Sequence, residues 1–176
     1  MNPRIALTGA SGRLAGVLRV ELVSAGYDVV TFERGELDIT RAEQVTAVID
    51  RLRPEIIINC AAYNAVDAAE ANRAAAFALN AHGPALLAAA SEAAGAVFVH
   101  FSSDFVFDGE AGEAYSEVDP TNPLNVYGAS KLAGEAAARC ASRHYILRVS
   151  SLFGGAGRNG HRATAGLPIG TLLGTT

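Results

Sequence analysis

Tyr127 and Lys131 form the first pair of residues whose types and spacing suggest chemistry. They lie four residues apart, and on a helix this spacing places a phenol and an ammonium group on one face. A nearby cation favours the phenolate, so we expect Lys131 to lower the pKa of Tyr127 from its usual value of about 10. Such a phenol suits a proton donor to a developing alkoxide. The pair alone is common by chance, so its meaning depends on what accompanies it.

Ser102, Ser103 and Asp104 directly follow a predicted strand over residues 96–101. In doubly wound parallel sheets, ligands bind outside the carboxyl ends of the strands. A serine hydroxyl at that edge would donate a hydrogen bond to a substrate carbonyl beside Tyr127, which makes Ser103 a candidate catalytic residue. The alternative is that these serines only cap the end of the strand.

A glycine-rich turn joins the first predicted strand to the first predicted helix. Its sequence over residues 8–15 is Thr-Gly-Ala-Ser-Gly-Arg-Leu-Ala. Small residues let the backbone approach a pyrophosphate, whose charge is favoured by the free N–H groups at a helix start. Glycines also simply make turns, but the strand before, the helix after and a further βαβ unit favour a dinucleotide site.

Glu33 and Arg34 follow the second predicted strand, about twenty residues beyond the glycines. An acidic side chain there accepts hydrogen bonds from the adenosine ribose, which favours NAD. Arg34 and Arg13 instead suit the 2′-phosphate of NADP, because a guanidinium group pairs well with phosphate. The alternative for all three is a solvated surface charge. The sequence leaves the choice between NADH and NADPH open.

The elements that would position these residues alternate between short apolar strands and alanine-rich helices. This pattern predicts an α/β fold, a Rossmann-like doubly wound parallel sheet of about five strands with helices on both faces. Thr40 and Glu43 match a capping box that opens a helix closed by Pro54, and Pro84 fits the first turn of a helix. We expect strands over residues 4–8, 28–32, 56–58, 96–101 and 145–149, and further helices over 12–25, 84–94 and 125–142.

The same pattern divides the chain into two parts. Residues 1–153 form the predicted dinucleotide-binding domain, and residues 154–176 form a glycine-rich irregular tail.

Composition excludes several classes of function. The chain of 176 residues is 50% hydrophobic and carries a net charge of −4, without the basic face that nucleic-acid binding needs. No apolar run is long enough for a signal peptide or membrane span, so a cytoplasmic protein is expected. Cys60 and Cys140 are expected to be buried reduced thiols. No metal site is expected, and the histidines, which show no ligand spacing, are predicted to be structural: His82, His100, His144 and His161.

Taken together, the motifs resemble the extended short-chain dehydrogenase/reductases and, within them, the dTDP-4-dehydrorhamnose reductase family. The resemblance spans residues 4 to about 155 and rests on five blocks, residues 8–14, 37–40, 59–67, 102–109 and 123–135. It implies NADPH- or NADH-dependent reduction of a 4-keto-deoxysugar nucleotide, as in dTDP-rhamnose biosynthesis. The 102–109 block lacks the Asp-Glu pair of sugar-nucleotide dehydratases, so reduction is favoured over dehydration.

The resemblance also implies roles for individual residues. Tyr127 would be the proton donor, supported by Lys131, and Ser103 and Asp104 would meet the sugar. The remaining contacts would be made with the dinucleotide. Its pyrophosphate would meet Gly9, Ser11, Gly12, Arg13 and Leu14. Its adenosine part would meet Glu33, Arg34, Asp38 and Ile39. Its nicotinamide side would meet Ala61, Ala62, Tyr63, Asn64 and Phe101.

The main departure from the family is length, because its members continue for more than a hundred further residues. Phe105 and Ser151 also stand where the family often has Tyr and Trp. Two alternatives therefore stay open. One is a non-catalytic nucleotide-binding or regulatory subunit, similar to the beta subunit of methionine adenosyltransferase. The other is an inactive truncated product. Whether the chain forms a homo-oligomer is also left open.

Overall fold

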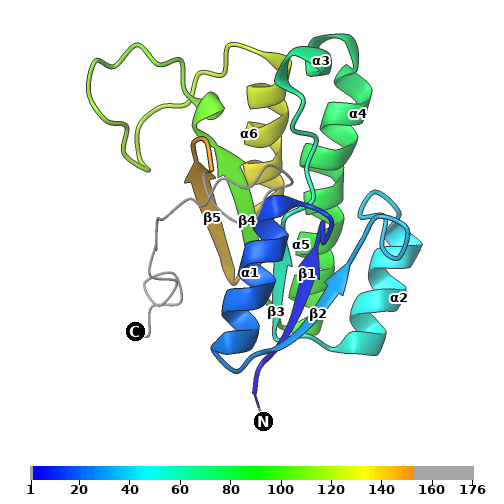
Figure 1. Ribbon diagram of the computed structural model, residues 1–176. Coiled ribbons are helices and arrows are strands. Elements are labelled where there is room, and N and C mark those ends of the chain that lie inside the picture. Colours follow the sequence, from blue (N-terminus) through cyan, green and yellow to red (C-terminus); the bar gives the residue numbers. More distant parts are fainter. Residues whose placement is uncertain (1, 153–176) are drawn as a thin grey trace.

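A computed structural model describes residues 2–152 and contains one parallel sheet of five strands in the order β2-β1-β3-β4-β5 (Figure 1). The strand bounds are β1 Arg4–Thr8, β2 Asp28–Phe32, β3 Ile56–Asn59, β4 Val97–Ser103 and β5 His144–Val149. Every neighbouring pair is parallel. The predicted α/β sheet is confirmed. From β1, the chain adds β2 on one side and β3 to β5 on the other, so the order of strands switches between β1 and β3. Doubly wound sheets hold their ligands at such a switch point.

Helices cover both faces of the sheet, as predicted (Figure 1). The four longer helices are α1 Arg13–Ser24, α2 Ala42–Leu52, α5 Gly83–Ala94 and α6 Val126–Ala138. Four short segments complete the described helices: α3 Val66–Ala71, α4 Arg73–Phe77, the π-helical turn η1 Ala78–His82 and the 3-10 turn η2 Asp104–Val106. Ile5 and Leu7 pack beneath α1, whereas Ala6 faces the cluster formed with α2, α5 and α6. β1 is therefore buried on both faces.

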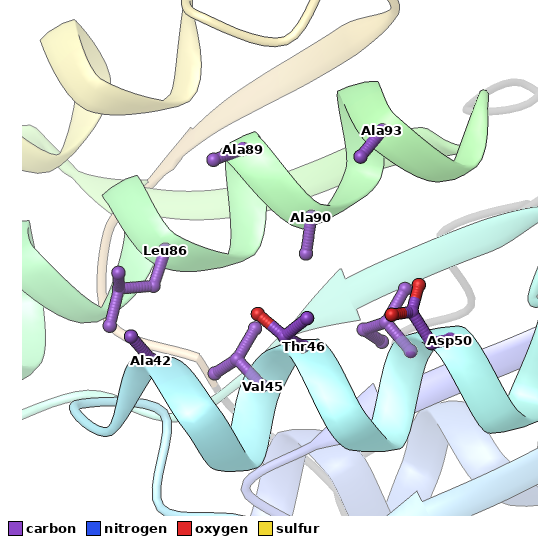
Figure 2. Close-up of a pocket in the computed structure, with 9 residues that line it drawn as sticks. Ala42, Val45, Thr46, Asp50, Leu86, Ala89, Ala90 and Ala93 are labelled. Carbon is purple, nitrogen blue, oxygen red and sulfur yellow. The ribbon is translucent and has the colours of Figure 1, made fainter.

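The groove between α2 and α5 lies outside the predicted site. Small side chains line most of it, among them Ala42, Ala89 and Ala90 (Figure 2). None of the predicted site residues takes part. Within residues 2–152, no helix combines the length and the apolar composition that crossing a membrane requires.

The predicted helix over residues 84–94 is confirmed as α5, with Pro84 in its first turn. Only the expected break in helical backbone just before Pro84 is wrong. Helical backbone runs from Arg73 through η1 into α5, because His82 and Gly83 both keep right-handed helical angles. Pro84 therefore lies inside a continuous helical run. A proline there cannot donate to the carbonyl four residues earlier, that of Asn80. The π-helical turn lies just before Pro84, at the place where the regular pattern of hydrogen bonds must break.

The predicted capping box is also wrong. Arg41 occupies the N-cap position of α2, and no side chain caps it. The Thr40 hydroxyl instead donates to Asp38 Oδ1 at 2.7 Å, and the Thr40 N–H donates to the same oxygen at 3.0 Å. An ionised carboxylate two residues away is a strong local acceptor. The hydroxyl is therefore engaged before the helix begins.

Two element ends differ from prediction by two residues or more, and one further segment cannot be compared. β4 continues to Ser103 because Ser102 and Ser103 still pair with Arg148 and Val149 of β5. Ser102 and Ser103 are therefore strand residues. α6 ends at Ala138, before the predicted residue 142, and tight turns over residues 138–141 follow. The predicted glycine-rich tail and its boundary with the dinucleotide domain lie outside the described residues.

Gly134 provides a test of how closely α6 packs on the rest of the fold. A Cβ atom at Gly134 would overlap the carbonyl oxygen of Asn80 and lie 3.1 Å from His100 Nε2. We expect Gly134→Ala to lower the free energy of unfolding by about 3 kcal/mol, because backbone cannot yield as a flexible side chain can. The matched control is Gly16→Ala in α1, where a Cβ meets no atom within 4 Å. Alanine should stabilise that helix by up to about 1 kcal/mol. Urea denaturation measures both, and equal effects at the two sites would contradict this packing.

Candidate active site

The predicted site residues come together because their strands are parallel and end at one edge of the sheet. Thr8 pairs with both Phe32 and Asn59 in the register, so the ends of β1, β2 and β3 are level. The glycine turn, the residues after β2 and the loop after β3 therefore leave from the same edge. β4 ends at Ser103 on that side too. The strand arrows in Figure 1 point toward this edge.

The glycine turn has the geometry expected for holding an anion. Gly9 has φ +70°, and a Cβ there would lie 2.7 Å from backbone atoms of Cys60 and Ala61. The Gly12 N–H donates to the Gly9 carbonyl, and Ala10 donates to Phe32 of β2. α1 starts at Arg13 without a side-chain cap. Its first N–H groups thus have no partner in the described part of the chain and remain available to a phosphate.

On the predicted adenosine side, the charged residues already contact one another. Arg34 Nε lies 3.7 Å from Asp38 Oδ2. The hydrogen bonds from Thr40 lower the pKa of Asp38, and the charge of Arg34 adds to this effect. Glu33 is exposed just beyond β2. Ile39 is only 2% exposed and packs against Gly83, so its side chain belongs to the core.

Two buried asparagines hold the loop of residues 61–64. Asn59 Oδ1 accepts from Thr8 Oγ1 at 2.7 Å and from the Ala61 N–H at 3.1 Å. Asn80 accepts from the Tyr63 N–H at 2.8 Å and donates to the Tyr63 carbonyl at 3.0 Å. Its side chain therefore binds both backbone polar groups of Tyr63. Neither asparagine was among the predicted site residues. The only sequence signal was a polar residue inside an otherwise apolar strand or helix.

The start of α6 is fixed at three points around Tyr127. Glu70 of α3 accepts from the Val126 N–H at 2.8 Å, and Asn125 accepts from the Gly128 N–H at 2.7 Å. A side chain at Gly128 would overlap the carbonyl oxygen of Phe105. The same Phe105 places its ring edge-on to Tyr127, with centroids 5.5 Å apart. Tyr127 is therefore held against the end of β4.

The electrostatics of the pair differ from the prediction. Burial raises the pKa of Tyr127; a hydrogen bond with Ser103 opposes this effect, and the charge of Asp104 adds to it. Lys131 is not among the groups that shift the pKa of Tyr127, and its Nζ donates to the Phe101 carbonyl at 2.5 Å. Burial lowers the pKa of Lys131 itself to about 8. The phenol is therefore protonated at neutral pH, which is the state that a proton donor requires.

Ser103 lies between the phenol and an exposed carboxylate. Its Oγ donates to Asp104 Oδ1 at 2.9 Å and accepts from the Phe105 N–H at 3.2 Å. Asp104 is exposed, whereas Ser103 is buried. Ser102, by contrast, points to the α6 side and donates to Glu135 at 2.7 Å. Of the two neighbouring serines, Ser103 is the one placed beside Tyr127.

The cysteines and histidines that the sequence singled out differ in their surroundings. Burial raises the pKa of Cys60 to about 12, so its thiol stays protonated. Cys140 is exposed, which contradicts the prediction that both thiols are buried. Burial lowers the pKa of His100 to about 3, and its Nδ1 contacts Asn59 Nδ2 at 3.2 Å. His100 is thus a neutral core residue. His161 lies outside the described residues.

Comparisons with known proteins agree on one family. The profile of the RmlD substrate binding domain matches residues 3–165. A dTDP-4-dehydrorhamnose reductase from Burkholderia thailandensis is 41% identical over 157 residues, covering 89% of this chain and 52% of that protein. One from Streptomyces griseus is 43% identical over 160 residues, covering 90% and 53%. The chain therefore spans about half the length of the curated relatives that it matches.

Solved structures show the same likeness in three dimensions. The dTDP-4-dehydrorhamnose reductase from Bacillus anthracis, in complex with NADP, superposes with a TM-score of 0.87 and 43% identity, covering 91% of this chain and 57% of that one. The orthologue from Clostridium acetobutylicum gives a TM-score of 0.85 and 39% identity, covering 89% and 56%.

Lys131 is the only lysine in the chain, which makes its protonation directly measurable. With ¹³C-labelled lysine, the Cε resonance of the native protein should titrate with a midpoint of about 8, well below the ordinary value of 10.5. The physical cause is burial of the charged form. Unfolding the same sample in urea should return the midpoint toward 10.5. A native midpoint near 10.5 would mean that the ammonium group is solvated, and would contradict its burial between α6 and β4.

Proposed function

Because the chain belongs to the RmlD substrate binding domain family, we propose that it binds NAD(P)H and reduces a 4-keto-deoxysugar nucleotide, as dTDP-4-dehydrorhamnose reductases do. One observation carries the proposal. A glycine turn with available N–H groups and a protonated phenol beside a serine hydroxyl occupy the same edge of one parallel sheet. This is the arrangement needed to hold a dinucleotide and to protonate a substrate oxygen next to it.

The dinucleotide site follows from the geometry of the turn. Gly9, Ser11, Gly12, Arg13 and Leu14 would hold the diphosphate through backbone N–H groups and the positive end of α1. The adenosine part would lie along the residues that follow β2, namely Glu33, Arg34, Asp38 and Ile39. The nicotinamide would lie toward the loop after β3 and β4, near Ala61, Ala62, Tyr63, Asn64 and Phe101. When bound, the nicotinamide supplies a hydride to the carbonyl carbon of the substrate.

Residues of this chain would supply the proton that the reduction requires. Tyr127 donates its phenolic proton to the carbonyl oxygen as negative charge develops there. The Ser103 hydroxyl, which donates to Asp104 in the structure, would turn to donate a hydrogen bond to the same oxygen, and exposed Asp104 would contact the sugar hydroxyls. Lys131 lies one helical turn beyond Tyr127, and its hydrogen bond to the Phe101 carbonyl fixes this part of α6 to β4. Glu70 and Asn125 keep the phenol in place while its charge changes.

We propose NADPH rather than NADH as the preferred form. Arg34 and Arg13 provide cations on the adenosine side, and the relative from Bacillus anthracis is a complex with NADP. Guanidinium groups suit the 2′-phosphate that distinguishes NADPH.

The cofactor preference can be tested by replacing both arginines. Arg13→Gln combined with Arg34→Gln should weaken NADPH binding about 10-fold or more, the usual effect of losing charge-assisted contacts to a phosphate, and should leave NADH binding unchanged. Nicotinamide fluorescence measures both dissociation constants. The control is Arg143→Gln, because Arg143 contacts the Gly95 carbonyl at the opposite end of the sheet. Equal weakening for both dinucleotides would contradict 2′-phosphate recognition.

The catalytic proposal predicts that the phenol is required for turnover but not for cofactor binding. Tyr127→Phe should reduce NADPH oxidation with dTDP-4-dehydrorhamnose about 100-fold or more while the NADPH dissociation constant stays within about 2-fold, because only proton transfer is lost. The matched control is Tyr145→Phe, since Tyr145 is an exposed tyrosine on β5. Equal losses in both variants would contradict the role of Tyr127.

A second candidate function rests on the glycine turn alone. The uncapped start of α1 suits a nucleotide phosphate, so the chain would also serve as a nucleotide-binding module without turnover of its own. The same assay separates the two candidates. NADPH binding without NADPH oxidation by the unmodified chain would reject the reductase and retain the binding module.

A further inference from the structure

Arg148 on β5 reaches across the edge of the sheet to a fully buried carboxylate on α6. Its Nε donates to Glu135 Oε1 and its Nη2 donates to Glu135 Oε2, both at 2.8 Å. Glu135 is 0% exposed. Ser102 and Arg139 donate to the same carboxylate at 2.7 and 3.2 Å. Burial alone raises the pKa of Glu135, but hydrogen bonds from Arg148 and Ser102 outweigh it and lower the pKa. The carboxylate is therefore ionised, and its bidentate partner is Arg148.

The same guanidinium group also holds the loop that follows β4. Its carbon lies 4.9 Å from the centroid of the Phe107 ring, and its Nη1 donates to the Glu117 carbonyl at 3.3 Å. Phe107 stacks on Tyr115 at 4.2 Å with an interplanar angle of 12°. Tyr115 in turn donates to Asp108 at 2.6 Å. Residues 107–117 thus form a closed loop whose aromatic base rests on Arg148.

This loop connects two parts of the proposed site. It leaves from η2, which begins with Asp104, and the chain returns from it to the start of α6, where Tyr127 lies. It projects beyond the sheet at the ends of β4 and β5 (Figure 1). A sugar nucleotide that contacts Asp104 would therefore lie close to the first residues of this loop, because the Phe107 N–H donates to the Asp104 carbonyl.

We propose that Arg148 is a positioning residue that fixes the loop of residues 107–117 to α6 and thereby shapes the sugar-nucleotide side of the site. The role in substrate binding rests on the proposed reductase function, whereas the coupling of loop and helix does not. Arg148 itself touches none of the proposed catalytic groups. It acts through Glu135, one helical turn beyond Lys131, and through Phe107, three residues after Asp104.

A lysine cannot replace all of these contacts at once. The guanidinium group is planar, so two of its nitrogens can pair with a carboxylate while its face covers an aromatic ring and a third nitrogen meets a carbonyl. An ammonium group is a point charge. It retains the neutralisation of Glu135 but gives up the remaining contacts to the loop. Arg148→Lys therefore separates the loop contacts from the stability of the buried pair.

The experiment compares Arg148→Lys and Phe107→Leu with the control Arg143→Lys. Phe107→Leu removes the ring and leaves the ion pair with Glu135 intact, whereas Arg143 lies at the far end of the sheet. Hydrogen–deuterium exchange of the unliganded full chain is followed by mass spectrometry over peptides from the loop, α6 and the glycine turn. NADPH binding and steady-state kinetics with dTDP-4-dehydrorhamnose are measured on the same samples.

Both test variants should accelerate exchange in residues 107–117 on the order of 10-fold, with α6 and the glycine turn unchanged. The KM for the sugar nucleotide should rise about 10-fold, while kcat and the NADPH dissociation constant stay within about 2-fold. The control should change none of these. Unchanged loop exchange, or parallel losses in NADPH binding and kcat, would overturn the proposal. If the unmodified chain turns over no substrate, the reductase function fails, and the exchange data alone decide whether Arg148 couples loop and helix.

Discussion

The close approach of α6 to its neighbours is the constraint on which the rest of the site depends. Two glycines allow it: at Gly128 a side chain would overlap the Phe105 carbonyl, and at Gly134 one would overlap the Asn80 carbonyl. This contact between backbones brings Tyr127 against the end of β4 and buries Lys131 at 3% exposure. The shifts in their pKa values follow from that burial, because low polarity disfavours the charged form of each group.

Polar groups buried by this approach are satisfied by one another, and the same hydrogen bonds orient the site. Asn59 ties β1 to the start of the 61–64 loop, Asn80 links that loop to Ser130, and Glu135 links α6 to β5. Within residues 2–152, His100 Nε2 is the one buried side-chain nitrogen or oxygen without a hydrogen-bond partner. Asn59 Oδ1 already accepts two hydrogen bonds, so its amide nitrogen donates to His100 Nδ1 and the histidine proton lies on Nε2.

Much of the fold was accessible from the sequence because its signals are local. The order of strands and helices, the glycine turn and the spacing of Tyr127 and Lys131 all follow from residue types within short windows. The errors arose where neighbouring residues offered a competing arrangement. Thr40 matched a capping box, but the Asp38 carboxylate, two residues away, engaged its hydroxyl. Pro84 lies in the first turn of α5, but helical residues directly before it continue the run through a π-helical turn.

The sequence by itself determined the α/β class of this protein, its glycine-rich turn between strand and helix and the position of the candidate acid, because periodicity and motif spacing need no knowledge of distant contacts. Only the tertiary structure decided that Tyr127 stays protonated, that Lys131 donates to the Phe101 carbonyl and that Asn80 grips Tyr63. It also decided that Arg148 joins Glu135 to the loop after β4. These outcomes depend on burial and on partners from distant parts of the chain, which folding alone brings within hydrogen-bonding distance.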